Sequence, residues 1–312
     1  MASKYIKNLR RYFLYLLLLL VEKILNHLPL KLVLKIGEGG GFLAYKLLKK
    51  ERQKTLANLE IAFASCKGKQ ERELIAGQVF KNLGKNLVEW IRIPQWDKED
   101  LNQIVTEVEG MDNLKAALAL GNGVIIVTAH LGCWELLACY LVEQGYPGVV
   151  IAKKIYYEKF NDYLEKIRFS HNVEIVYRTE SARKSLNHLK QNKMLGILPD
   201  QDIAGIDGVF VDFFGQPAYT PKGPVFLAML SKAPLLPCFI VRKDDDTHKI
   251  IIKPALELEQ TGDKERDLLV NTQKWSREVE ACIARYPGQW VWMHRRWKKR
   301  EEYQDDVGNK KN

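Results

Sequence analysis

The sequence predicts an α/β fold: a mixed, mostly parallel central sheet flanked by helices, with an N-terminal membrane-associated helix. Three observations lead to this prediction. From residue 124 onward, short runs rich in Val, Ile and Leu alternate with helical stretches of about a dozen residues, which is typical of βαβ units. An apolar run near the N-terminus follows several Lys and Arg residues. The 312-residue chain is 46% hydrophobic with a formal net charge of +10, which suits a large core and an acidic partner or anionic membrane surface.

Residues 1–36 are predicted to form a membrane-associated helical segment, with Tyr5–Leu28 as its anchor. Four basic residues precede the ten-residue apolar run Tyr12–Val21. Ten residues are too few to span a membrane, which needs about twenty, and no small-residue cleavage site of a signal peptide follows. A basic flank beside an aromatic and Leu-rich body is typical of a helix that lies in the membrane interface or inserts at a short tilt. A soluble core helix is the alternative.

Residues 37–304 are expected to form the main domain, and the polar residues 305–312 a disordered tail. Gly37–Gly41 has a Gly-x-Gly pattern, but no strand precedes it, so we interpret it as a flexible or close-packing joint. Helical periodicity is then expected in Phe42–Phe63 and Glu71–Ile93, and a break in Pro94–Asp100.

The alternating part of the chain follows. The expected strands are Ile104–Glu109, Val124–Thr128, Val149–Ala152, Val173–Tyr177 and Leu195–Leu198. The expected helices are Met111–Leu120, Trp134–Gly145, Glu158–Phe169 and Ser181–Gln191. An antiparallel hairpin of Leu235–Val241 and Lys249–Ile252, and then a long helix over Gly262–Arg285, are expected to complete the domain.

His130 is the first candidate for chemistry. It follows the buried strand Val124–Thr128 and precedes a helix, which places it at the carboxyl edge where α/β sheets bind ligands. Glu135 lies five residues further on, and five helical residues turn through about 500°. The two side chains can therefore meet only if His130 is in a loop and Glu135 in the first helical turn. There the carboxylate would fix the imidazole tautomer and strengthen it as a base. A structural His and a Glu that stabilises the helix dipole are the alternative.

A second acidic motif follows another strand of the predicted sheet. Asp200 and Asp202 come directly after Leu195–Leu198 and could face His130 across the crevice, although an Asp at a strand end often serves as a cap.

Basic side chains also fall near predicted strand ends. Lys153 follows one strand, Arg168 closes the next helix, and Arg242 ends a later strand. A phosphate-bearing substrate needs such groups. The alternative for Lys153 and Arg168 is that they cap helix ends or pair with nearby acids such as Glu165.

Several kinds of site lack support in this sequence. There is no G-x-S-x-G elbow, Cys–His arrangement or P-loop. The five cysteines show neither C-x-x-C nor zinc spacing, so they are expected to be reduced thiols, and neither a metal nor a cofactor is predicted. No helix-turn-helix, RRM or zinc-finger signature supports nucleic-acid binding. A non-enzymatic basic module that binds membranes or nucleic acid remains the rival from another class.

Several motifs occur in order along nearly the whole chain: His130-Leu-Gly-Cys-Trp-Glu135, Pro199-Asp200-Gln201-Asp202, Val209–Gly215 with Pro217–Thr220, and Gln289–Lys298. In this order they resemble the lauroyl/myristoyl acyltransferase family of bacterial lipid A synthesis. That family is related to the glycerol-phosphate and lysophospholipid acyltransferases, which share a His-x4-acid motif. Two residues depart from the family pattern: Cys133 stands where Asn is usual, and Lys153 where Arg is usual.

The resemblance implies an acyltransferase of lipopolysaccharide biosynthesis at the cytoplasmic face of the cell inner membrane. It would move a fatty acyl chain from acyl carrier protein, or from acyl-coenzyme A, to a hydroxyl of a lipid A precursor. A lysophospholipid or another glycolipid is the alternative acceptor. His130 would act as general base with Glu135 as its partner, and no covalent enzyme intermediate is needed. The remaining candidates would bind substrate: Lys153, Arg168 and Arg242 the headgroup phosphates, and Asp200 and Asp202 polar groups of the acceptor, unless the two aspartates pair structurally.

Overall fold

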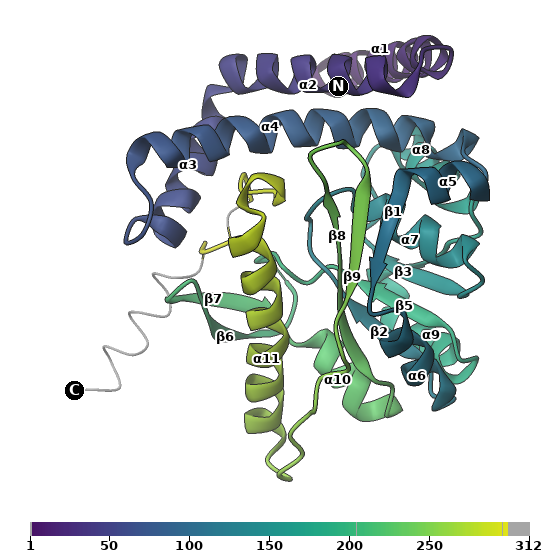
Figure 1. Cartoon of the computed structure of the whole chain (residues 1–312), viewed down its shortest axis with the longest axis vertical. Helices are drawn as coiled ribbons and strands as arrows, with labels where there is room; N and C mark the ends of the chain where they lie inside the picture. Colours follow the sequence, from purple (N-terminus) through teal and green to yellow (C-terminus); the bar gives the residue numbers. More distant parts are fainter. Residues whose placement is uncertain (1, 204, 295, 299–312) are drawn as a thin grey trace.

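The computed structural model describes residues 2–203, 205–294 and 296–298. A seven-stranded sheet in the order β1-β9-β8-β2-β5-β3-β4 lies at its centre, and a separate β6-β7 hairpin lies beside it (Figure 1). Only β8 and β9 pair antiparallel within the large sheet, and its other strand pairs are parallel. The predicted α/β class with a mixed, mostly parallel sheet is confirmed.

The element bounds agree closely with the predicted alternation. The strands are β1 Val105–Glu109, β2 Val124–Val127, β3 Gly148–Ala152, β4 Glu174–Tyr177, β5 Met194–Ile197, β6 Gly208–Phe213, β7 Gln216–Pro221, β8 Leu235–Arg242 and β9 His248–Ile252. The α-helices are α1 Ala2–Asn26, α2 Leu30–Leu47, α3 Lys49–Phe63, α4 Lys69–Arg92, α5 Lys98–Ile104, α6 Met111–Ala119, α7 Trp134–Glu143, α8 Glu158–Phe169, α9 Ser181–Lys190, α10 Gly223–Ser231 and α11 Lys264–Arg285. Among the described residues, Ile93–Gln95, Arg178–Glu180 and Pro287–Gln289 form short 3₁₀ turns.

The sheet separates two apolar cores. On one face, Leu114 of α6, Leu136 of α7 and Ile167 of α8 belong to one buried cluster. On the other face, residues of α9, α10 and α11 pack with the β2 and β5 side chains that point that way. Strand β2 lies between β8 and β5 and is buried along its whole length. An apolar β-branched run is therefore the sequence this position requires.

Some elements differ from the sequence expectation. The single helix expected over Phe42–Phe63 is two helices, because the chain turns at Leu48 between α2 and α3. The predicted break after Pro94 is short, and α5 begins at Lys98 behind a capping box formed by Asp97 and Asp100. The β6-β7 hairpin and α10 were not predicted as elements at all.

Gly37–Gly41 lies inside α2, so the flexible joint expected there is wrong and the close-packing alternative is correct. A Cβ on Gly41 would lie 2.1 Å from the carbonyl oxygen of Phe80, and one on Gly84 would lie 2.0 Å from that of Gly37. Helices α2 and α4 therefore touch backbone to backbone, which only glycine allows. The boundary expected between residues 36 and 37 falls within this packed helix.

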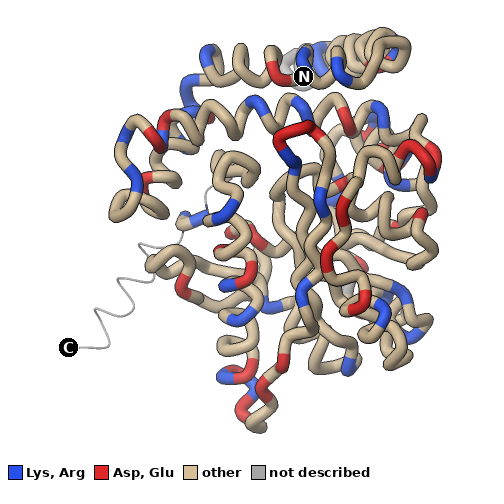
Figure 2. The backbone as a smooth tube through the Cα atoms, viewed as in Figure 1, with Lys and Arg blue, Asp and Glu red and all other residues tan. Residues whose placement is uncertain are grey.

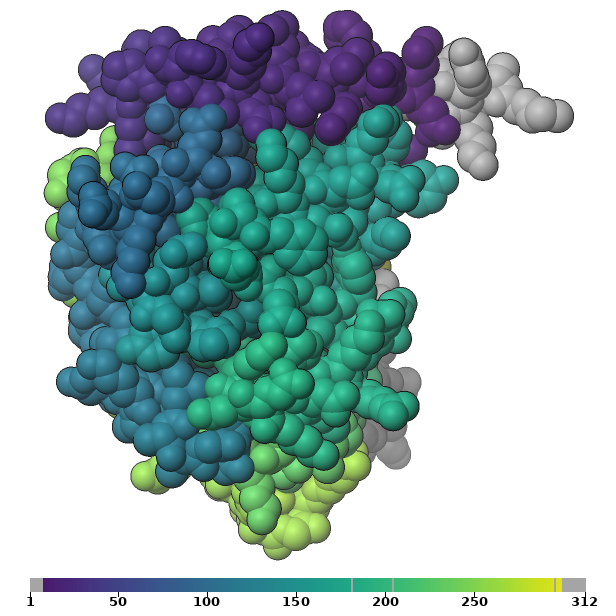
Figure 3. Space-filling view, turned by 90° about the vertical axis from the view of Figure 1, so that its right-hand side faces the viewer, coloured from purple at the N-terminus to yellow at the C-terminus, as the bar shows by residue number. Residues whose placement is uncertain are grey.

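Helices α1 and α2 form a layer on the outer side of α4, which itself crosses the upper end of the sheet (Figure 1). Seen from the side, this layer covers the top of the body (Figure 3). Helix α1 also reaches α8 through an ion pair between Glu22 and Lys166. None of the helices in the described part of the chain is long and apolar enough to span a membrane. The tail expected at 305–312 lies outside the described residues.

Candidate active site

His130 lies in the loop between β2 and α7, at the carboxyl edge of the sheet. Strands β2 and β5 pair in parallel, with Val127 opposite Ile197. His130 follows Val127 by three residues and Asp200 follows Ile197 by three, so both lie just beyond the carboxyl ends of the two paired strands. The Asp200 carboxylate lies 2.7 Å from Nδ1 of His130 and accepts the His130 backbone N–H at 2.8 Å.

The environment of Asp200 keeps its carboxylate ionised. Burial by itself raises the pKa of Asp200, but the charge of His130 and hydrogen bonds from His130 and Trp290 outweigh it and hold the pKa well below its usual range. The Trp290 indole donates to Asp200 at 2.8 Å. An ionised carboxylate at Nδ1 favours the proton on that nitrogen and leaves Nε2 as the basic one.

The expected contact between His130 and Glu135 is absent. The two conditions for it hold, since His130 is in the loop and Glu135 is in the first turn of α7. However, both carboxylate oxygens of Glu135 accept from the Arg168 guanidinium, at 2.7 and 2.9 Å. Arg168 reaches them from the last turn of α8, and this two-point pair turns Glu135 away from the imidazole. The carboxylate partner of His130 in this structure is Asp200.

The other predicted residues have different surroundings. Arg168 pairs with Glu135 and not with Glu165. Lys153 is exposed at the end of β3 and makes no ion pair with a described residue. Asp202 is half-buried in the loop after β5, and its charge, with that of Asp200, acts on the buried Arg296. Burial dominates there and lowers the pKa of Arg296 to about 10.

The expected phosphate-binding role of Arg242 does not fit its position. Arg242 is 6% exposed, and its guanidinium hydrogen-bonds to both carboxylate oxygens of Glu89 on α4. Buried His248 contacts the same carboxylate at 2.9 Å. Burial raises the pKa of Glu89, but the charges of His248 and Arg242 lower it overall to about 2. Arg242 ends a strand beneath α4, and α4 covers it from solvent.

Sequence reasoning missed the C-terminal segment as part of the site. The backbone of Gln289 accepts the Gly132 N–H, Val291 donates to the His130 carbonyl oxygen, and Leu131 forms a β-bridge with Trp290. These contacts bring the His294 ring beside His130, with 5.5 Å between ring centroids. The sequence offered one indication of this role: His294 lies within the Trp-rich motif Gln289–Lys298.

Residues 3–299 match the family of bacterial lipid A biosynthesis acyltransferases. The chain belongs to this family. It is 29% identical over 290 residues to the lipid A biosynthesis lauroyltransferase of Escherichia coli K12, covering 88% of each chain. It is 28% identical over 280 residues to the palmitoleoyltransferase of the same organism, covering 88% of this chain and 87% of the relative. A phosphatidylinositol mannoside acyltransferase of Mycobacterium tuberculosis (strain CDC 1551 / Oshkosh) is 27% identical over 228 residues, covering 70% and 68%. The chain is accordingly an O-acyltransferase.

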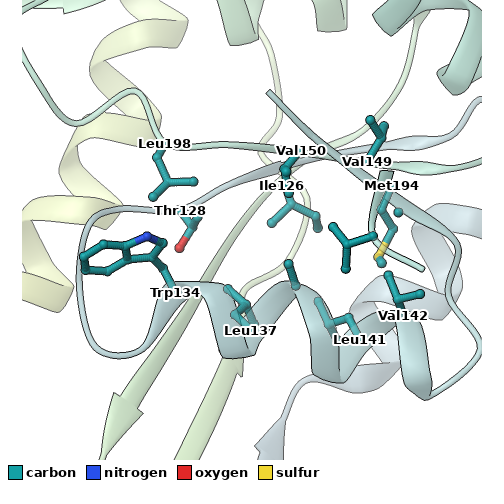
Figure 4. A pocket seen from close by; sticks show the side chains of 14 residues that line it. Ile126, Thr128, Trp134, Leu137, Leu141, Val142, Val149, Val150, Met194 and Leu198 are labelled. Atoms are coloured by element: carbon teal, nitrogen blue, oxygen red, sulfur yellow. The ribbon is translucent and has the colours of Figure 1, made fainter. Parts of the chain in front are cut away.

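Trp134 connects His130 to an apolar pocket of this acyltransferase. Trp134 packs edge-on against His130, with 5.1 Å between ring centroids, and also lines the pocket together with Thr128 and Leu198. From there the pocket runs between α7 and the sheet, past Leu137 and Leu141, toward its far end at Val142 and Met194 (Figure 4). Gly148 and Gly196 also line it.

The acyltransferase has no activated thiol at this site. Cys133, which replaces the family's usual Asn, is fully buried at the start of α7 and caps no helix N–H. Burial, and then the charge of Glu89, raises the pKa of the Cys133 thiol well above its usual range. No group of three or more His, Cys, Asp or Glu side chains among the described residues is placed to hold a metal ion. Lys and Arg are spread over most elements and interspersed with Asp and Glu (Figure 2).

Proposed function

We propose that the chain transfers a fatty acyl group from an acyl thioester to a hydroxyl of a lipid A precursor, with His130 as general base. One observation carries this proposal: a His oriented by an ionised carboxylate packs against Trp134, which also lines an apolar pocket. The Nε2 atom of His130 makes no hydrogen bond to a described residue and is free to receive the hydroxyl proton. Asp200 then stabilises the imidazolium that forms, which is the role the sequence pattern gave to Glu135.

The pocket suits the acyl chain. Its lining is almost wholly aliphatic, and burial of methylene groups stabilises a bound chain by about 0.8 kcal/mol each. With the chain between α7 and the sheet, the thioester carbonyl would lie at the pocket mouth, beside Trp134 and His130. Asp202 and Lys153 remain candidates for polar and phosphate groups of the acceptor, because both follow strands that end near this edge.

A membrane position agrees with the surface of α1 and α2. Both helices expose large apolar side chains: Leu9, Tyr12, Phe13, Leu14, Leu16, Leu17, Leu20 and Ile24 on α1, and Leu32, Ile36, Phe42, Leu43 and Leu47 on α2. An amphipathic layer of this kind lies in the interface of a bilayer. Helix α4 separates this layer from the carboxyl ends of the strands, since Asn86 of α4 donates to the Gly132 carbonyl oxygen at 2.8 Å. We therefore infer that the crevice opens close to the cytoplasmic face of the inner membrane, where acyl carrier protein or acyl-coenzyme A is available.

The activity is tested with the purified full-length chain in vesicles. Defined acyl-carrier-protein and acyl-coenzyme A thioesters are supplied with a lipid A precursor, a phosphatidylinositol mannoside or a lysophospholipid, and products are measured by mass spectrometry. We expect acylation of the lipid A precursor. Acylation of only one of the other lipids would show that this lipid is the acceptor. No transfer in any combination would refute the proposal.

Membrane docking has a separate test by vesicle flotation. The triple variant Phe13→Glu, Leu17→Glu, Leu20→Glu should no longer float with anionic vesicles. Leu120→Glu is the matched control, because Leu120 is 64% exposed but follows α6 at the opposite end of the molecule (Figure 1). Equal flotation of both variants would argue against docking through α1.

A further inference from the structure

The segment 289–294 holds a second imidazole, that of His294, beside His130. Buried Asn58 of α3 donates to the carbonyl oxygens of Trp292 and His294. Together with the hydrogen bonds that join Gln289 and Val291 to the His130 loop, these contacts fix the backbone on both sides of the His294 ring. The ring planes of His130 and His294 are inclined by 56° at 5.5 Å between centroids. The position of His294 is thus set by the same contacts that build the His130 site.

Attack on a thioester needs a hydrogen-bond donor for the carbonyl oxygen, which becomes an oxyanion. The three consecutive backbone N–H groups of His130, Leu131 and Gly132 already have acceptors. The N–H of His130 donates to Asp200, that of Leu131 to Ala129, and that of Gly132 to Gln289. The Trp290 indole is also engaged, with Asp200. By contrast, neither ring nitrogen of half-buried His294 hydrogen-bonds to a described residue.

The charge state of His294 fits a neutral donor. Burial, followed by the charge of His130, lowers the pKa of His294 to about 4. Asp200 and Glu51 act in the opposite direction, and Lys54 acts in the same direction as His130. At neutral pH the ring therefore carries one N–H and no net charge. A neutral imidazole can polarise a carbonyl without competing for the proton that the general base removes.

We propose that the His294 side chain donates a hydrogen bond to the thioester carbonyl oxygen in the transition state, as a catalytic residue distinct from the His130–Asp200 pair. The inference rests on the proposed acyl transfer. The acceptor hydroxyl oxygen bonds to the carbonyl carbon, its proton moves to His130 Nε2, and the carbonyl π pair moves onto the oxygen that faces His294. When the C=O bond re-forms, the C–S bond breaks with its electron pair on sulfur, and the thiolate takes the proton from His130. An ester and a thiol result, and both histidines return to their starting state.

Two substitutions test the hydrogen bond. His294→Phe keeps a ring and removes the donor, and should lower kcat by about 10²–10³-fold while both KM values stay within about twofold. His294→Asn keeps a neutral N–H donor and should recover about tenfold or more of that loss. A purely structural role would show no such recovery. His188→Ala is the control, because His188 is also half-buried but lies on α9, outside the site. The kcat of this variant should match that of the original chain.

The pH profile adds a second readout. Because the lowered pKa of His294, about 4, keeps its ring neutral above that pH, His294→Phe should lower the plateau of kcat without moving the midpoint of its acid limb. A folded His294→Phe enzyme with kcat within fivefold of the original, or His294→Asn no better than His294→Phe, overturns the inference. If His294→Phe does not fold, the same comparison is made between His294→Ala and His294→Asn. Loss of transfer in the unsubstituted chain would refute the proposed function itself, whereas active His294→Phe beside inactive His130→Ala would refute only this inference.

Discussion

Glu135 and Arg168 form a buried two-point ion pair that joins the first turn of α7 to the last turn of α8. The side chains are 8% and 15% exposed, respectively. Burial lowers the pKa of Arg168, but the charge and hydrogen bonds of Glu135 raise it overall, so the guanidinium stays charged. The pair makes no hydrogen bond to His130, whose carboxylate partner is Asp200. We infer that it supports α7, whose inner face lines the acyl pocket.

The first prediction follows from this pair. Glu135→Ala or Arg168→Ala leaves one buried charge unpaired, which typically costs about 3–5 kcal/mol. We expect each variant to unfold at a clearly lower temperature and the double variant to lose less than the sum of the two. Thermal unfolding of the four proteins measures this coupling. If Glu135 instead oriented His130, Glu135→Ala would lose kcat by about 10²-fold at an unchanged melting temperature.

The difference between prediction and structure at Glu135 has a local cause. The five-residue spacing of His130 and Glu135 was sufficient to place both correctly in loop and helix, but the direction of the carboxylate depends on a guanidinium contributed by α8. Such a contact between elements leaves no periodic signal. Arg242 shows the same limit: its strand and the helix α4 were both predicted, but the sequence did not show that Glu89 of α4 would pair with it.

The elements that the sequence predicted well are those with a clear hydrophobic pattern. Strands β2 and β5 were found from their apolar runs, and their parallel pairing alone brings His130 opposite Asp200. The β6-β7 hairpin was missed because Gly208–Pro221 contains two prolines and no long apolar run. His294 was missed because no spacing rule joins it to a residue more than 160 positions earlier.

The second prediction concerns the proposed base and its carboxylate. His130→Ala should lower kcat by about 10²–10⁴-fold. Asp200→Asn should lower it too, because a neutral amide neither fixes the Nδ1 proton nor stabilises the imidazolium. Steady-state rates and circular dichroism of both variants provide the check. Near-normal turnover by folded His130→Ala would exclude it as the base.

The third prediction concerns the contact between α2 and α4. Gly84→Ala places a methyl group 2.0 Å from the carbonyl oxygen of Gly37, so the helices must separate and stability should fall by about 1–3 kcal/mol. Gly39→Ala is the matched control, because no atom lies within 4 Å of its added Cβ. It should be neutral or stabilising, since alanine favours helix over glycine by about 1 kcal/mol. Equal melting temperatures for the two variants would contradict the close packing.

The fourth prediction concerns acyl-chain length. Met194 lies at the far end of the apolar pocket (Figure 4). Gly196 also lines the pocket and lies two residues further along the same strand, β5. Met194→Ala should extend the pocket and shift the preferred donor to a longer chain. Gly196→Val should shift it to a shorter one, because Val150 is already 3.3 Å from the position of an added Cβ. Competition among thioesters of different length gives the ratio of kcat/KM values. Unchanged ratios in both variants would place the acyl chain elsewhere.

The last prediction links His294 to acid stability and needs no substrate. The pKa of His294 is lowered from 6.5 to about 4 in the folded chain, so between these values the unfolded chain binds a proton that the folded chain does not. Stability from a neutral His294 is therefore present above pH 6.5 and is lost as the pH falls toward 4. The full loss is at most about 3 kcal/mol for a shift of this size, and less in practice because the ring is partly exposed to solvent. His294→Phe removes the titrating group, so its unfolding free energy should fall less steeply from pH 6.5 to 4.5 than that of the original chain. Urea unfolding at a series of pH values measures both slopes. Parallel slopes would mean that His294 has the same pKa in the folded and the unfolded chain. The argument that its ring is held neutral in the folded protein would then fail.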